Sequence, residues 1–156
     1  MILTPLKIIA FALHLLLATP QVSSGQIAVV VNPENPIDHL ESQELERSFL
    51  GKTSVFSEGD QVQLCVHQNL REEFYAQALE MSPNQVRRHW IKAVFSGKRS
   101  KPPEPLKEAA DVRAFVAENK GALAIISFAK IDSTVKVLTI DGMLPGQPGY
   151  PLAAKE

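Results

Sequence analysis

The chain has 156 residues, of which 45% are hydrophobic and 21% are charged, and its formal net charge at pH 7 is −1. This composition is typical of one folded globular domain and excludes an intrinsically disordered chain. The near balance of 16 basic and 17 acidic residues gives no support for a nucleic-acid binder, which presents a strongly basic surface.

Residues 1–25 have the pattern of a secretory signal peptide. Lys7 precedes an apolar run from Ile8 to Ala18, Pro20 interrupts it, and small residues follow. The run is shorter than the about 20 apolar residues of a membrane span. We therefore predict a periplasmic protein whose signal peptide is removed, which leaves one domain at 26–156 without a stable membrane span. An uncleaved anchor is the alternative.

The predicted domain begins with a buried strand and a short helix. Residues 27–31 are all apolar, which is typical of a strand buried on both faces of a sheet. A helix is expected from about Ser42, with apolar residues one turn apart, and it ends at Gly51. Residues 61–66 alternate polar and apolar side chains and predict a second strand.

Two further helices are indicated by capping signals. Asn69 is a candidate cap for the first of them, with Glu72 three residues later. The stretch "SPNQ" at 82–85 is a sharper start signal, because it combines a capping serine, a proline at the first helical position and a capping-box glutamine. That helix is expected to end at Gly97 and to bury three apolar residues, Val86, Trp90 and Val94.

Residues 98–105, "KRSKPPEP", predict an exposed loop, because adjacent prolines cannot continue a helix. Basic residues near a helix C-terminus are usually solvated and complement the helix dipole. Contact with an acidic partner or with membrane headgroups is the alternative interpretation of its three basic residues, Lys98, Arg99 and Lys101.

The rest of the chain predicts a fourth helix, two strands and a tail. The helix runs from about Lys107 to Asn119, with Gly121 as its expected left-handed cap. The strands "ALAIISF" and "VKVLTI" follow, and the tail at 141–156 is too rich in Gly and Pro for regular structure. This order predicts an α/β domain with a mixed sheet of about four strands covered by helices.

Two Gly-Lys pairs, at Gly51 and Gly97, look like the end of a nucleotide-binding P-loop. That motif requires a glycine five residues before the pair, and those positions hold Glu46 and Lys92. Both pairs also end predicted helices, whereas a P-loop opens one. We interpret the two glycines as left-handed helix caps, with no nucleotide site.

The sequence contains no motif for metal binding or for nucleophilic catalysis. The three histidines of the predicted domain, His39, His67 and His89, lack metal-ligand spacing, and no G-x-S-x-G nucleophile motif is present. Cys65 lies inside a predicted strand and is interpreted as a structural thiol. The sequence therefore predicts a non-enzymatic protein with no catalytic residue, no metal and no cofactor.

One turn is a candidate anion site. Residues 66–72, "VHQNLRE", lead from a strand directly into a helix, where backbone amides meet the positive end of the helix dipole. The candidate ligand-binding residues for a small, phosphate-like oxyanion are His67, Asn69 and Arg71. Simple capping of the helix by Asn69 is the alternative.

Four segments taken together resemble small phosphate ABC transporter substrate-binding-like proteins. They are "IAVVVNPENPIDHLESQELERSFLGK", "REEFYAQAL", "QVRRHWIKAVFSGK" and "VRAFVAENKGALAIISF". The resemblance implies an exported, non-enzymatic domain that looks like one lobe of a type 2 periplasmic binding protein. In full-length phosphate binders a Ser-Gly-Thr precedes the helix of "REEF" and holds phosphate; this chain has Gln68-Asn69-Leu70 there.

A single lobe supplies only half of a closing ligand clamp. The resemblance therefore leads us to expect an accessory or sensory protein of the cell envelope, which works with an envelope protein partner or as a homodimer and binds an anion weakly. The alternative is a true solute-binding component of a transporter for phosphate or another oxyanion.

Overall fold

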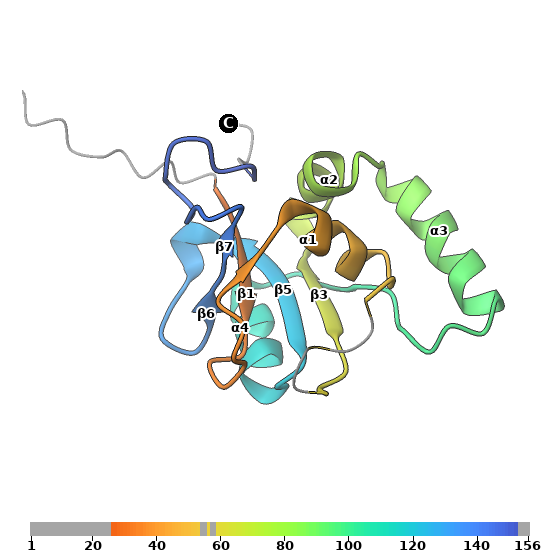
Figure 1. The fold of residues 1–156 in the computed structure, drawn as a ribbon, viewed down its shortest axis with the longest axis horizontal. Helices are drawn as coiled ribbons and strands as arrows, with labels where there is room; N and C mark the ends of the chain where they lie inside the picture. The colour runs from red at the N-terminus through yellow and green to blue at the C-terminus, as the bar shows by residue number, and fades with distance from the viewer. Residues whose placement is uncertain (1–25, 54–55, 57–58, 153–156) are drawn as a thin grey trace, which may run out of the picture.

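The computed structural model describes residues 26–53, 56 and 59–152 (Figure 1), so the predicted signal peptide lies outside the described residues. Helices are interspersed between the strands as far as β5, Ala122–Ser127. In chain order the strands and α-helices are β1 Ile27–Val31, β2 His39–Leu40, α1 Ser42–Phe49, β3 Gln63–His67, α2 Arg71–Phe74, α3 Pro83–Phe95, β4 Glu104–Leu106, α4 Ala109–Glu118, β5 Ala122–Ser127, β6 Lys136–Val137 and β7 Thr139–Ile140.

The main sheet has five strands in the order β4-β3-β5-β1-β6. Strand β3 is parallel to β4 and β5, whereas β1 is antiparallel to β5 and β6. A separate two-stranded parallel sheet joins β2 and β7. The predicted α/β class and mixed sheet are confirmed. The predicted last strand divides at Leu138, and its two halves pair in different sheets.

The exposed loop predicted at 98–105 is confirmed for residues 98–103, which lie outside helices and strands, but its end is corrected because the fifth strand, β4, begins at Glu104. Its three residues pair with Cys65, Val66 and His67 of β3, and Pro105 stands in the middle of it. Proline is tolerated there because β4 is an edge strand, whose outer side needs no donor.

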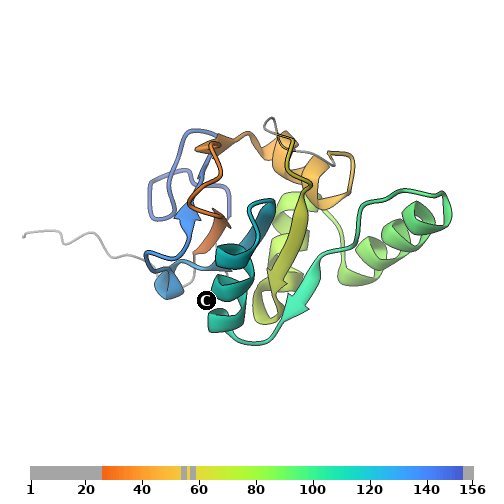
Figure 2. The same cartoon turned by 90° about the horizontal axis from the view of Figure 1, so that it is seen from below.

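The two faces of the sheet carry separate hydrophobic cores, which explains why 27–31 is apolar throughout. Ile27, Val29 and Val31 belong to the core shared with α1 and α3. Ala28 and Val30 belong to the core shared with α4 on the opposite face. Figures 1 and 2 show α4 behind the sheet and α1 in front of it.

The prediction of a left-handed helix cap is confirmed at two of the three glycines and wrong at the third. Gly51 and Gly97 have positive φ angles of 69° and 82°, as left-handed helix caps require. Gly121 does not have a positive φ, so its prediction as a left-handed cap is wrong. Its reason is steric: an added Cβ would lie 1.9 Å from the carbonyl oxygen of Gln61, so only glycine fits where the two segments meet.

Two helix details are also corrected. Asn69 does not cap a helix: it lies within a 3₁₀ turn, Gln68–Leu70, and the residue before α2 is Leu70. After α2 the chain continues as a π-helical turn over Tyr75–Leu79. The Ser82–Gln85 capping box is confirmed, with Gln85 N donating to Ser82 Oγ at 3.2 Å. Val94, predicted to be buried, is 52% exposed.

The Gly- and Pro-rich tail packs on the first strand. Tyr150 is buried and its hydroxyl donates to the carbonyl of Ile27 at 2.7 Å, while the Ile27 amide donates to Leu152 O at 3.2 Å. Residues 26–152 thus contain the described helices, the described strands and both cores. Within this described part, no helix has the length and apolar character needed to cross a membrane.

Candidate functional site

The Gly-Lys-Thr stretch forms the C-terminal end of α1. The amide of Lys52 donates to Arg47 O at 2.8 Å, which closes the last helical turn. Two side chains of α3 also bind carbonyls there: Trp90 Nε1 donates to Phe49 O at 3.2 Å, and His89 Nε2 donates to Leu50 O at 2.8 Å. The carbonyl end of a helix repels phosphate, so the geometry agrees with the interpretation of Gly51 as a helix cap.

His67 lies at the carboxyl end of β3, next to the parallel strand β4. Its Nε2 lies 3.1 Å from the carbonyl oxygen of Lys107, so this nitrogen carries the hydrogen. Its Nδ1 is buried and has no hydrogen-bond partner. The neutral ring therefore offers an acceptor at Nδ1, and it ties β3 to the segment that leads into α4. An anion would need a donor at this atom, which only the protonated ring provides.

Asn69 and Arg71 point to different surroundings. Asn69 is exposed on the 3₁₀ turn, whereas Arg71 is half-buried at the start of α2 and lines a groove beside α3. Of the three candidate ligand-binding residues, the groove includes only Arg71. The first turn of α2 also carries Glu72 and Glu73, whose negative charges oppose an anion. The structure does not gather the three residues around one cavity.

The groove is a second candidate site, which the sequence analysis did not find. It has a volume of about 320 Å³ and lies between the start of α2, α3 and the prolines before β4. Its walls are mostly apolar, and its cationic side chains are Arg71 and Arg87. The remaining lining residues are Tyr75, Pro83, Asn84, Val86, Trp90, Ile91, Pro102, Pro103 and Pro105. These residues lie in three separate stretches of sequence, 71–75, 83–91 and 102–105, so no local motif indicates the groove.

The titratable groups of the described part do not favour catalysis. Burial raises the pKa of Tyr75 in the groove to about 12, with Arg71 acting in the opposite direction, so this phenol stays protonated at neutral pH. Burial, with a smaller contribution from Glu104, raises the pKa of Cys65 to about 12. That thiol is therefore a weak nucleophile. Among the described residues, no group of three or more metal-ligating side chains comes together.

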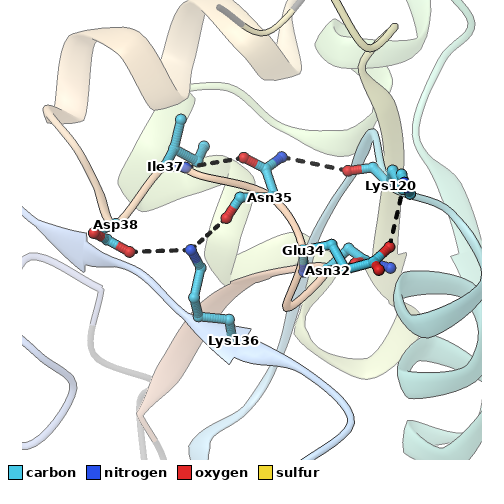
Figure 3. A network of polar contacts seen from close by, with 7 residues as sticks. All are labelled: Asn32, Glu34, Asn35, Ile37, Asp38, Lys120 and Lys136. Carbon is cyan, nitrogen blue, oxygen red and sulfur yellow. Dashed lines mark hydrogen bonds and ion pairs between the residues drawn. The ribbon is translucent and has the colours of Figure 1, made fainter. Parts of the chain in front are cut away.

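A polar network after β1 is structural (Figure 3). Asn32 is buried and its Nδ2 donates to Val116 O and Ala117 O at the end of α4, at 2.9 and 3.0 Å. Asn35 accepts from the amide of Ile37 through its side chain. Lys136 joins the loop to β6, since its Nζ donates to the carbonyl of Asn35 and to Asp38 Oδ1. The buried side-chain amides of Asn32 and Asn35 are satisfied within the protein, so the "NPENP" stretch orients β1 against α4.

No family model and no curated protein matches the sequence. Solved structures do match the fold. An ABC-type phosphate transport receptor from Vibrio cholerae is 16% identical at a TM-score of 0.61, over 78% of this chain and 48% of that one. A putative phosphate ABC transporter substrate-binding protein with bound phosphate from Clostridium perfringens is 16% identical at a TM-score of 0.62, over 78% of this chain and 47% of that one. PstS from Borrelia burgdorferi is 10% identical at a TM-score of 0.61, over 84% of this chain and 55% of that one.

The chain is therefore an α/β domain with the fold of one lobe of a type 2 periplasmic binding protein. The structures that it is similar to are phosphate ABC transporter substrate-binding proteins, and it spans about half of their length. The identity is too low for these likenesses to show more than the fold.

Proposed function

We propose that this protein is an exported, non-enzymatic binding-protein lobe that acts as an accessory or sensory component of the cell envelope, through contact with another protein. The observation that carries the proposal is the coverage: about 80% of this chain matches about half of each solved relative. A lobe of this kind provides one wall of a ligand clamp, and in this proposal a partner protein or a second copy provides the other.

The chemistry of the β3–α2 turn supports a protein contact over independent anion capture. The ring of His67 is held by the carbonyl of Lys107 and presents no donor at Nδ1 in its neutral form. Glu72 and Glu73 place negative charge in the first turn of α2. The exposed Gln68 and Asn69 then form a polar surface at the carboxyl end of β3, where parallel α/β sheets present their binding edge.

A photocrosslinking experiment tests the contact. A photoreactive amino acid at Asn69 is expected to form an adduct with an envelope protein, or with a second copy, in living cells. Glu118 at the end of α4 is the matched control, because α4 runs antiparallel to the parallel strands and ends at the opposite edge of the sheet. An adduct of equal yield at both positions, or none at Asn69, would contradict the proposal.

The second candidate is a true solute-binding component for phosphate or another small oxyanion. It is favoured by the likeness to a structure with bound phosphate and by the presence of Arg71 after the turn. Calorimetric titration of residues 26–156 with phosphate and sulfate separates the two functions. The accessory function predicts no micromolar affinity for either anion and at most weak binding at millimolar concentration. A micromolar affinity that Arg71→Ala abolishes and Arg88→Ala leaves intact would establish the solute binder.

Export is part of the proposal and has its own measurement. The signal-peptide pattern predicts that the protein recovered from the envelope fraction begins at about residue 25 or 26. N-terminal sequencing of that protein decides the matter. A protein that still begins at Met1 would favour the uncleaved anchor.

A further inference from the structure

The strongest charge asymmetry of the chain lies on α3 and the loop that follows it. Between Glu80 and Glu104 the sequence holds six of the 16 basic residues and none of the 17 acidic residues. The six are Arg87, Arg88, Lys92, Lys98, Arg99 and Lys101, and each is exposed. In the part of the chain that the structure describes, none of them forms an ion pair. Their positive charge is therefore uncompensated within the domain.

The same segment exposes an apolar surface. Three of the four large hydrophobic residues that are exposed in the described part lie on α3: Ile91 at 47%, Val94 at 52% and Phe95 at 88%. The helix turns by about 100° per residue, which places Ile91 and Phe95 on the outer side, away from the buried Val86, Trp90 and Ala93, while Val94 lies next to Trp90 at the border of the buried side. Single exposed apolar residues are ordinary, but Ile91 and Phe95 are one turn apart on the same outer face and Val94 is exposed beside them, so together they mark an interaction surface.

The position of α3 allows this surface to meet a broad partner. Figures 1 and 2 show that α3 projects from the body of the domain, with its C-terminal end farthest from the sheet. Phe95 is the last residue of α3, two residues before Gly97 and the basic loop. The outer face of α3, Arg87 to Phe95, and the loop 98–101 are called the basic arm below.

We propose that the basic arm binds the surface of an anionic phospholipid membrane. Helices that lie in a membrane interface bury Phe and aliphatic side chains at the acyl boundary while Lys and Arg stay among the headgroups. The basic arm has this pattern, with Ile91 and Phe95 between Arg87, Arg88 and Lys92. Anionic headgroups complement its six uncompensated charges.

The alternative occupants fit less well. A second copy that packs arm against arm would bring the same cationic residues together, which like-charge repulsion opposes. A peptide in the neighbouring groove would be lined by Ile91 and Arg87 but not by Val94, Phe95 or the loop lysines. A membrane surface contacts the projecting, convex end of α3 and the loop at the same time.

Vesicle binding tests the proposal. We would use residues 26–156, which contain the described fold, because the apolar run Ile8 to Ala18 would itself bind lipid. The probe is sonicated vesicles of phosphatidylcholine that contain about 30% phosphatidylglycerol, at low ionic strength. Vesicles of phosphatidylcholine alone serve as the reference. Cosedimentation is expected with the anionic vesicles and should fall as salt is added.

Two matched pairs of variants assign the binding to the arm. The triple variant Lys98→Glu, Arg99→Glu and Lys101→Glu is expected to weaken binding about tenfold or more, since each cation contributes near the surface. The same charge change on exposed lysines elsewhere, Lys52→Glu, Lys107→Glu and Lys130→Glu, should weaken it much less.

The apolar pair is Phe95→Ser against Leu144→Ser, the latter at the remaining exposed large hydrophobic residue of the described part. Phe95→Ser should weaken binding about tenfold and Leu144→Ser should not. No sedimentation with anionic vesicles, or equal loss in both members of each pair, would overturn the proposal. Self-association in analytical ultracentrifugation that Phe95→Ser abolishes, without vesicle binding, would assign the face to a second copy and also overturn it.

Discussion

The two Gly-Lys pairs end two helices in the same backbone conformation but in opposite surroundings. Gly51 has a φ of 69° and lies in the body of the domain, where an added Cβ would stand 2.5 Å from the ring of Trp90. Gly97 has a φ of 82° at the end of the basic arm, where an added Cβ would meet no atom within 4 Å. The same short motif therefore fixes the packing of one helix end and leaves the other as free surface.

The largest expected difference comes from placing alanine at each glycine. Gly51→Ala combines left-handed strain with a clash against a buried indole, and we expect it to lower the free energy of unfolding by about 2–5 kcal/mol. Gly97→Ala carries only the backbone strain and should lower it by about 1 kcal/mol. Urea unfolding of both variants measures the difference. Equal losses would show that Trp90 moves aside at no cost, and the comparison would fail.

The second test removes the hydrogen bond that α3 supplies to the end of α1. Trp90→Phe keeps an aromatic ring but leaves the buried carbonyl of Phe49 without its donor, so we expect a loss of roughly 1–3 kcal/mol. Phe95→Leu is the control on the exposed side of the same helix and should change stability by less than about 0.5 kcal/mol. Thermal or urea unfolding that shows no loss in Trp90→Phe would mean that neither the hydrogen bond to Phe49 O nor the larger volume of the indole contributes to stability.

Strands could be predicted from the sequence where consecutive residues are all apolar and buried. Residues 27–31 and 122–126 are apolar throughout because α4 covers one face of the sheet and α1 with α3 covers the other. Strand β4 could not be predicted, because its pairing with Cys65–His67 is non-local and Pro105 hides it. Val94 was predicted to be buried from the helical period alone, but α3 projects past the sheet and leaves that turn without a surface to cover it.

The sequence predicted where in the chain the candidate site lies, but not which contacts its side chains make. The strand–turn–helix pattern located the carboxyl end of β3 correctly. It could not foresee that His67 would be engaged by Lys107 O, 40 residues later in the sequence, or that Arg71 would face the groove beside α3. Side-chain directions of that kind depend on tertiary contacts, which local spacing does not encode.

A smaller effect is expected at the start of α3, the helix that carries the basic arm. Ser82 and Gln85 form a reciprocal capping box, with Ser82 N donating to Gln85 Oε1 at 2.8 Å. Ser82→Ala removes the acceptor for the Gln85 amide and should lower the free energy of unfolding by about 1 kcal/mol. Ser82→Asp, which can still accept, is the matched control and should restore most of the loss. If both variants lose the same amount, the cap is satisfied by water instead.

The smallest effect on stability is expected for a thiol placed on the arm. Phe95→Cys should change the free energy of unfolding by less than about 0.5 kcal/mol, because Phe95 is 88% exposed. The introduced thiol should react with an aromatic disulfide reagent at pH 8 without unfolding. Cys65 should stay unmodified until the protein is denatured, because burial, with the charge of Glu104, raises its pKa from 9.0 to about 12.

The raised pKa of Cys65 also fixes the direction of a pH effect. Between pH 9 and about 12 the unfolded thiol loses its proton while the folded one keeps it, so stability is full below pH 9 and falls as the pH rises through that window. Tyr75, with its pKa raised to about 12, acts in the same direction at slightly higher pH. Cys65→Ala should therefore reduce the alkaline loss measured by urea unfolding at pH 8 and 10.5. Phe95→Cys should leave that loss unchanged, because a solvated thiol titrates alike in both states. A Phe95→Cys variant that becomes more sensitive to alkali would mean that the end of α3 is buried in solution, and the contrast between the two helix ends would be lost.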